Sequence, residues 1–229
     1  MQTKLLALIV VAASLAASTA LRAQIVWSTP TSGLGDASSV ATNGSYYDAI
    51  VAHIGASQET VLNPTTNVST VFNAYEPSTL TDGTITLAGA GYGGDGSGSS
   101  ATPYDAALNG TTFVQNYTGE IQIGGLNPGS TYQIQIWNVD NDPTRLTSFT
   151  DGVSSPVQFY FGNVIGTFTA GSSTETIDYT NVVPNTNDTF TAGEVNAVDV
   201  RLVPEPSTYA MLFAGIGALV LVVRLRRLV

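Results

Sequence analysis

Cysteine is absent from this 229-residue chain, and basic residues are scarce. Without cysteine the chain cannot form a disulfide scaffold, a zinc knuckle, an iron–sulfur site or a thiol nucleophile. Seven Lys and Arg residues stand against seventeen Asp and Glu residues, and the net charge is -10. This balance excludes binding to a nucleic-acid backbone, which requires basic side chains that displace counterions. Charged residues make up only 10% of the chain, which argues against coiled coils and long exposed helices.

The first 23 residues have the pattern of a secretory signal peptide. Lys4 precedes a short apolar run over residues 5–13, and small residues follow it. Small side chains favour cleavage by signal peptidase after Ala20 or after Ala23. The run is too short and too rich in Ala and Ser to serve as a permanent anchor, which needs about 20 apolar residues. We therefore expect export of the chain by the Sec pathway.

The last 27 residues, 203–229, predict a second membrane signal. Val203-Pro204-Glu205-Pro206 precedes an uncharged stretch over residues 209–223, which would form a helix of about 22 Å. A hydrocarbon core is about 30 Å thick, so this helix suits a transient anchor better than a lifelong one. Arginines hold the far end of the helix in the cytoplasm by the positive-inside bias, and the rest of the chain on the other side. These arginines are Arg224, Arg226 and Arg227.

The Val203-Pro204-Glu205-Pro206 motif, the short apolar helix and the arginine cluster together resemble the PEP-CTERM sorting signal of Gram-negative bacteria. The resemblance implies that the protein is exported, held by its tail in the inner membrane and processed near Pro204-Glu205-Pro206 by an exosortase. That enzyme is a membrane-embedded, transpeptidase-like partner that acts in trans. The resemblance also implies a place at the cell surface or in the extracellular matrix, together with exopolysaccharide or biofilm. A plain C-terminal anchor with a proline-rich stalk is the alternative.

Residues 24–202 predict a single all-β domain. Tyr132, Ile134 and Ile136 alternate with polar residues, and so do Val198 and Val200, whose neighbours Asp199 and Arg201 should then point outward. Several such short strands separated by Gly, Pro, Asn and Asp turns, without crossover helices, predict an antiparallel β-sandwich. Residues 24–202 hold two basic and sixteen acidic residues, a net charge of −14, which favours solubility outside the cell.

Residues 126–132 carry a more specific pattern. Pro128 and Gly129 predict a type II turn into the strand that begins at Thr131, because Gly129 accepts a positive φ. The Leu-x-Pro-Gly-x-x-Tyr spacing that ends at Tyr132 resembles the tyrosine corner of fibronectin type III and immunoglobulin-like sandwiches. Residues 104–202 resemble, more loosely, the galactose-binding-like jelly-roll domains that precede PEP-CTERM tails. We prefer the jelly roll, since 179 residues exceed an immunoglobulin-like domain of about 100.

Few residues suggest chemistry. His53 is the only histidine, so a two-histidine metal site is excluded. Residues 89–94 match the G-x-G-x-x-G spacing of dinucleotide sites, but a Gly- and Ser-rich stretch follows where such a site needs a helix. Acidic residues near the strand that ends at Trp137 fit a calcium site better, because hard cations take several carboxylate oxygens. The candidates are Asp140, Asp142 and Asp151.

Two hypotheses from different classes follow. The first is a non-enzymatic surface or matrix protein that binds glycan, with Trp137 and Tyr92 as aromatic platforms for a sugar ring. Calcium is the only cofactor that it could need. The second is a surface hydrolase of exopolysaccharide, which requires a pair of carboxyl groups, one of them with a raised pKa. A permanently anchored adhesin is a third possibility, in which residues 224–229 survive in the mature protein.

Overall fold

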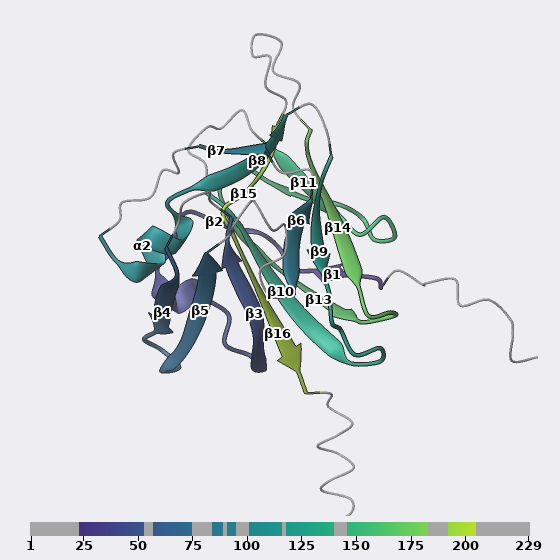
Figure 1. The fold of residues 1–229 in the computed structure, drawn as a ribbon, viewed down its shortest axis with the longest axis horizontal. Helices are drawn as coiled ribbons and strands as arrows, with labels where there is room; N and C mark the ends of the chain where they lie inside the picture. The colour runs from purple at the N-terminus through teal and green to yellow at the C-terminus, as the bar shows by residue number, and fades with distance from the viewer. Residues whose placement is uncertain are drawn as a thin grey trace, which may run out of the picture.

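The computed structural model describes residues 23–52, 57–74, 84–88, 91–94, 101–115, 118–139, 146–182 and 192–204, with only the backbone given for 91–94, 111–115 and 192. Strands dominate these ranges, and Figure 1 shows them in stacked sheets. The predicted all-β sandwich is confirmed. Within the same ranges no helix is long and apolar enough to cross a membrane, and the span predicted at 209–223 lies outside them.

The strands form three sheets. The first has the order β1 (Val26–Trp27), β13 (Gly162–Thr169), β10 (Thr131–Asn138), β16 (Ala197–Val203), β3 (Ser45–Val51), β5 (Val68–Ala74) and β4 (Glu59–Asn63), and β2 (Thr31–Ser32) also pairs with β13. The second has the order β12 (Val157–Phe159), β11 (Thr147–Thr150), β14 (Glu175–Asn181), β9 (Gly119–Ile123) and β6 (Ile85–Ala88). The third is β15 (Ala192–Val195), β8 (Thr111–Gln115) and β7 (Gly91–Gly94).

The main core lies between the first and second sheets. The alternating residues Tyr132, Ile134 and Ile136 of β10 point into it, as the sequence pattern predicts. Val198 and Val200 of β16 join them from the next strand. The second sheet supplies the facing side chains, which are Ile85, Leu87, Ile121, Ile123, Phe149, Val157, Phe159, Ile177 and Tyr179. Burial of such alternating faces from two sheets is what closes a sandwich.

A second core covers the outer face of the first sheet. The short helices η2 (Ala37–Ser39) and α2 (Pro103–Leu108) lie on this side, together with strand β4. Helix α2 begins at Thr102, whose side chain accepts a hydrogen bond from the Asp105 N–H, and Pro103 fills the first helical turn. Trp137 lies in this second core, edge-on to Phe72 with ring centroids 5.7 Å apart.

Two details differ from the predicted antiparallel sandwich. Strand β3 pairs with β5 in parallel, at Ile50 with Asn73 and Val51 with Ala74, whereas its other neighbour β16 is antiparallel. The second difference is that Asp199 and Arg201 are buried and do not point to solvent, so that prediction is wrong. Alternation correctly places both side chains on the face opposite Val198, but other segments of the chain cover that face.

The turn before β10 confirms the predicted corner. The Ser130 N–H donates to the Asn127 carbonyl oxygen at 3.0 Å, and Gly129 has φ of +86°. This is the hydrogen bond and the positive φ of a type II turn. The hydroxyl of buried Tyr132 accepts a hydrogen bond from the Asn127 N–H at 2.9 Å, which ties the turn to the strand.

We expect Tyr132→Phe to lower the free energy of unfolding by about 1 kcal/mol, because the Asn127 N–H loses its acceptor while the ring still packs. Tyr160→Phe is the matched control, since Tyr160 is 50% exposed, and its effect should stay within about 0.5 kcal/mol. Urea unfolding of both variants measures the difference, and equal losses would contradict a role for the hydroxyl.

Candidate functional site

The C-terminal end of β16 is the point where the sandwich meets the predicted sorting segment. We call Leu202, Val203 and Pro204 the tail junction. Leu202 pairs with Ser45 of β3, and Val203 pairs with Thr131 of β10. Pro204 is exposed and follows the last residue of the strand. Because proline has no N–H, it cannot extend the ladder, and the sheet ends there.

A close backbone approach fixes the tail junction. Gly44 precedes β3 and has φ of +91°, a conformation that side chains disfavour. A Cβ placed there would lie 2.5 Å from the Leu202 carbonyl oxygen and 3.2 Å from the Val203 Cα. Only glycine therefore lets the start of β3 pack this closely against the end of β16.

Gly44→Ala should destabilise the fold more than Gly33→Ala does. Both residues have positive φ, which costs a non-glycine residue about 1–2 kcal/mol. At Gly33 a Cβ would meet nothing within 4 Å, whereas at Gly44 it would collide with the tail junction as well. Urea unfolding of the two variants compares them directly. Equal losses of unfolding free energy would contradict tight packing at the tail junction.

A buried polar cluster lies directly before the tail junction along β16. Arg201 donates from Nε to Asp199 Oδ2 at 2.9 Å and also donates to Thr70 Oγ1. On β3, Asp48 accepts hydrogen bonds from the Thr84 N–H at 2.8 Å and from Asn73 at 3.1 Å. Arg201, Asp199, Thr70 and Asp48 are at most 5% exposed, so they hold strands together, whereas alternation predicted that Asp199 and Arg201 point to solvent.

Burial raises the pKa of Asp199 to about 6, against the opposing effect of Arg201. The unfolded chain releases this proton near pH 3.8, whereas the folded chain holds it until about pH 6. The folded state therefore binds more protons between these values, so the Asp199 contribution makes stability fall as pH rises through that window.

Asp199→Asn should remove this pH dependence. We expect the natural chain to lose stability relative to the variant as pH rises, because asparagine stays neutral whereas Asp199 becomes a buried carboxylate. Between pH 4 and pH 6 the stability of the natural chain should fall while that of the variant stays flat, since only the natural chain releases the proton there. Urea unfolding at several pH values tests this, and parallel curves would contradict it.

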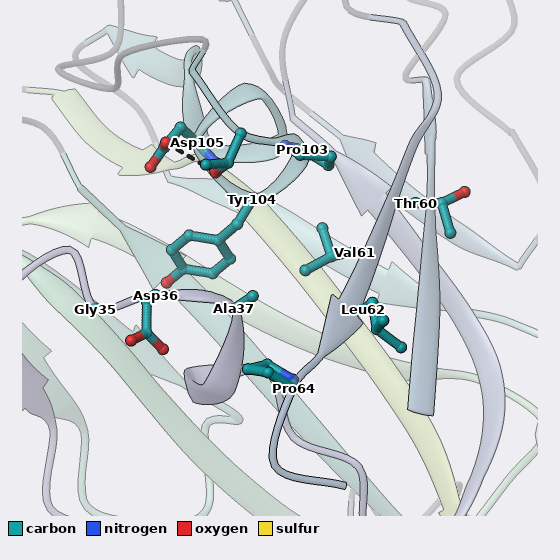
Figure 2. Close-up of a pocket in the computed structure, with 11 residues that line it drawn as sticks. Gly35, Asp36, Ala37, Thr60, Val61, Leu62, Pro64, Pro103, Tyr104 and Asp105 are labelled. Atoms are coloured by element: carbon teal, nitrogen blue, oxygen red, sulfur yellow. Dashed lines mark hydrogen bonds between the residues drawn. The ribbon is translucent and has the colours of Figure 1, made fainter. Parts of the chain in front are cut away.

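A surface cavity of about 440 Å³ lies between β4, η2 and α2. Figure 2 shows Asp36, Tyr104 and Asp105 on one side of it and Thr60, Val61 and Leu62 on the other. The Tyr104 hydroxyl donates to the Leu34 carbonyl oxygen at 2.6 Å, and burial raises its pKa to about 12. The complete lining comprises Gly35, Asp36, Ala37, Thr60, Val61, Leu62, Pro64, Thr102, Pro103, Tyr104 and Asp105.

Both carboxylates of the cavity already accept hydrogen bonds at the start of a short helix. Asp36 accepts hydrogen bonds from the Ser38 N–H and hydroxyl, and these lower its pKa. Asp105 accepts one from the Thr102 hydroxyl at 2.8 Å. A glycosidase acid needs a raised pKa, and Asp36 has the opposite shift. The cavity thus offers hydrogen-bond acceptors and apolar surface to a ligand.

The carboxylate of Asp151 is engaged by hydrogen bonds from described residues. It is fully buried, and Oδ2 accepts hydrogen bonds from the Ile25 N–H at 2.6 Å and the Ser154 hydroxyl at 2.7 Å. Oδ1 accepts from the N–H groups of Val153 and Ser154. Burial alone would raise the pKa of Asp151, but these hydrogen bonds lower it overall. The predicted calcium ligand therefore ties the N-terminal segment to a loop.

The structure describes the other predicted ligand residues to different extents. Trp137 is fully buried against Phe72, so no sugar ring can stack on it, and that prediction is wrong. Tyr92 lies on β7, where only the backbone is described. Asp140, Asp142 and His53 lie outside the described residues. Within the described ranges, no group of three or more His, Cys, Asp or Glu residues could hold a metal ion.

The structure describes some of the predicted processing residues and not others. Ala20 lies outside the described residues, whereas Ala23 is buried and its N–H donates to Glu175 Oε2 at 3.0 Å. Cleavage after Ala23 would remove a residue that packs in the main core. Val203 and Pro204 form the tail junction. The remaining sorting residues, Glu205, Pro206, Arg224, Arg226 and Arg227, lie outside the described ranges.

Residues 202–227 match the family model of the PEP-CTERM protein-sorting motif. The chain carries this sorting motif over these residues. The motif begins inside β16, at the first residue of the tail junction. A PEP-CTERM motif implies an exported protein that an exosortase processes and sorts to the surface. No curated protein matches the chain.

Solved structures with similar chains are distant. The ANX2 ectodomain from Arabidopsis thaliana is 9% identical, with a TM-score of 0.46, over 77% of this chain and 56% of that one. The plant receptor-like kinase FER is 11% identical, with a TM-score of 0.41, over 70% of this chain and 50% of that one. A carbohydrate-binding module of the β-sandwich superfamily is 13% identical over 80% and 92% of the two chains, with a TM-score of 0.21. This PEP-CTERM chain spans about half the length of the plant ectodomains.

Proposed function

We propose that this PEP-CTERM protein is a non-enzymatic surface or matrix protein of a Gram-negative bacterium. Signal peptidase removes its leader, the C-terminal helix holds it transiently in the inner membrane, and an exosortase removes the tail. The sandwich then remains on the cell surface or in the extracellular matrix, together with exopolysaccharide. The observation that carries this proposal is the position of the sorting motif, which starts in the last strand of the sandwich.

The engagement of the buried acids supports a role without catalysis. Asp151 accepts hydrogen bonds from its own loop and from Ile25, and Asp48 accepts them from Thr84 and Asn73. Asp199 has the raised pKa that a general acid needs, but it is 1% exposed and paired with Arg201. A substrate could not reach it. A hydrolase would need such a carboxyl in an open cleft.

The proposal includes glycan binding at the surface cavity. Sugars present hydroxyl groups and apolar ring faces, and the cavity offers two carboxylates on one side and Leu62 and Pro64 on the other. Leu62 is 49% exposed, so its side chain is open to a ligand. Calcium ligation by Asp140 and Asp142 remains part of the proposal as a second route to glycan binding.

Processing of the tail tests the sorting function. The full chain is expressed in a bacterium that has an exosortase and in a matched strain without it, and intact masses are compared. We expect residues 224–229 to be lost only in the first strain. Pro204→Ala combined with Pro206→Ala should retain the tail, because the prolines keep this peptide extended. Pro156→Ala, at an exposed position on another loop, is the control. Survival of residues 224–229 in the natural chain would indicate an anchored adhesin.

Glycan binding is tested separately with recombinant residues 21–204 on a panel of bacterial exopolysaccharides. Leu62→Lys should weaken glycan binding about tenfold or more, because a charged side chain then crosses the cavity mouth. A tenfold change corresponds to a loss of about 1.4 kcal/mol in binding free energy. Val153→Lys is the control, since Val153 is 57% exposed and does not line the cavity. Binding that a chelator abolishes would point to Asp140 and Asp142, and no binding would contradict the glycan part of the proposal.

A further inference from the structure

The strand that leads into the sorting tail is not an edge strand. β16 lies between β10 and β3, and both antiparallel ladders reach the tail junction, the one with β3 after a register shift between Val200 and Arg201. Figure 1 shows the arrow of β16 between its neighbours, ending at the same edge of the sheet where β3 begins. The main-chain groups of a central strand are hydrogen-bonded on both sides. They are not free to bind another protein.

An enzyme that cleaves a peptide binds it in an extended form, largely through main-chain hydrogen bonds. Upstream of Val203, such binding would require β16 to leave the sheet. Val198 and Val200 would then leave the main core, and Arg201 would lose Asp199 and Thr70. From Pro204 onward none of these contacts is lost, because Pro204 is exposed and lies outside the ladder.

We propose that the exosortase acts on the folded protein and breaks a peptide bond C-terminal to Val203, so the mature chain keeps all of β16. This inference rests on the proposed sorting function. In the reaction, the acyl carbon leaves the nitrogen of the tail and joins water or an amine at the cell surface. The tail departs with a free α-amino group, which takes up the proton of that nucleophile.

The length of the segment between β16 and the predicted helix limits the distance between the sandwich and the enzyme. Five residues, 204–208, separate Val203 from the helix predicted at 209–223, and they span at most about 17 Å. The active site must therefore lie near the outer membrane surface of the enzyme, with the sandwich directly against it. Residues 24–202 carry a net charge of −14, which an anionic lipid surface repels within about 8–10 Å at physiological salt. That repulsion favours release once the tail is cut.

A disulfide staple tests whether β16 must open. Thr131→Cys combined with Val203→Cys joins paired residues of β10 and β16, whose separation suits a disulfide. The natural chain has no cysteine, so no other bridge can form within the chain in the oxidising periplasm. The full chain is expressed with the exosortase, and intact mass confirms the bridge. Thr131→Cys and Val203→Cys alone are the matched controls.

We expect the stapled protein to lose its tail at the rate of the Val203→Cys control. Loss of processing that a reductant restores would overturn the inference, because it would mean that β16 must leave the sheet. The mass of the natural processed chain provides an independent test. A C-terminus at Val203 or beyond supports the inference, and one upstream of Val203 overturns it. A chain that is never processed, beside another tailed protein that is, would instead contradict the sorting function itself.

Discussion

The position of β16 in the middle of the largest sheet is the constraint on which the rest of the molecule depends. Its two edges are bonded to β10 and β3, one face supplies Val198 and Val200 to the main core, and the other carries Asp199 and Arg201. The last strand of the described residues therefore closes both the sheet and the core. The chain reaches its final fold only when the residues next to the sorting motif are in place.

Several buried charged side chains of the described residues are held by hydrogen bonds from distant segments of the chain. Asp48 bridges β3 to the start of β6 through Thr84 and Ile85, and Arg201 joins Asp199 to Thr70. In the N-terminal segment, the N–H groups of Ile25 and Ala23 donate hydrogen bonds to Asp151 and Glu175 respectively. A buried carboxylate without such donors would cost several kcal/mol. Among the described acids, Asp48, Asp151, Glu175 and Asp199 thus hold segments of the sandwich together.

Local patterns were predicted well, and contacts between distant segments were not. The corner from Asn127 to Tyr132 and the sorting motif are contained in a few consecutive residues, so spacing and turn chemistry suffice. Alternation correctly separates Val200 from Arg201 but does not tell whether the second face is covered. That cover comes from other segments: Thr70 of β5 accepts a hydrogen bond from Arg201. The short, weakly periodic elements η2, β4 and α2 share the second core with Trp137. The burial of Trp137 and the cavity beside Tyr104 depend on the same packing, so they were missed. The one available sequence signal of this burial was Arg201. It is one of two basic residues in an acidic domain, and it lies two positions from Asp199.

Native-state hydrogen exchange of the full chain tests the central role of β16 most directly. If this strand closes the fold, the amides from Val198 to Leu202 exchange only when the whole domain unfolds, and they share one free energy of opening with Ile134 of β10. Exchange that becomes progressively faster toward Leu202, at a free energy well below that of Ile134, would show that the end of β16 frays. That result would contradict a sandwich that is closed up to its sorting tail.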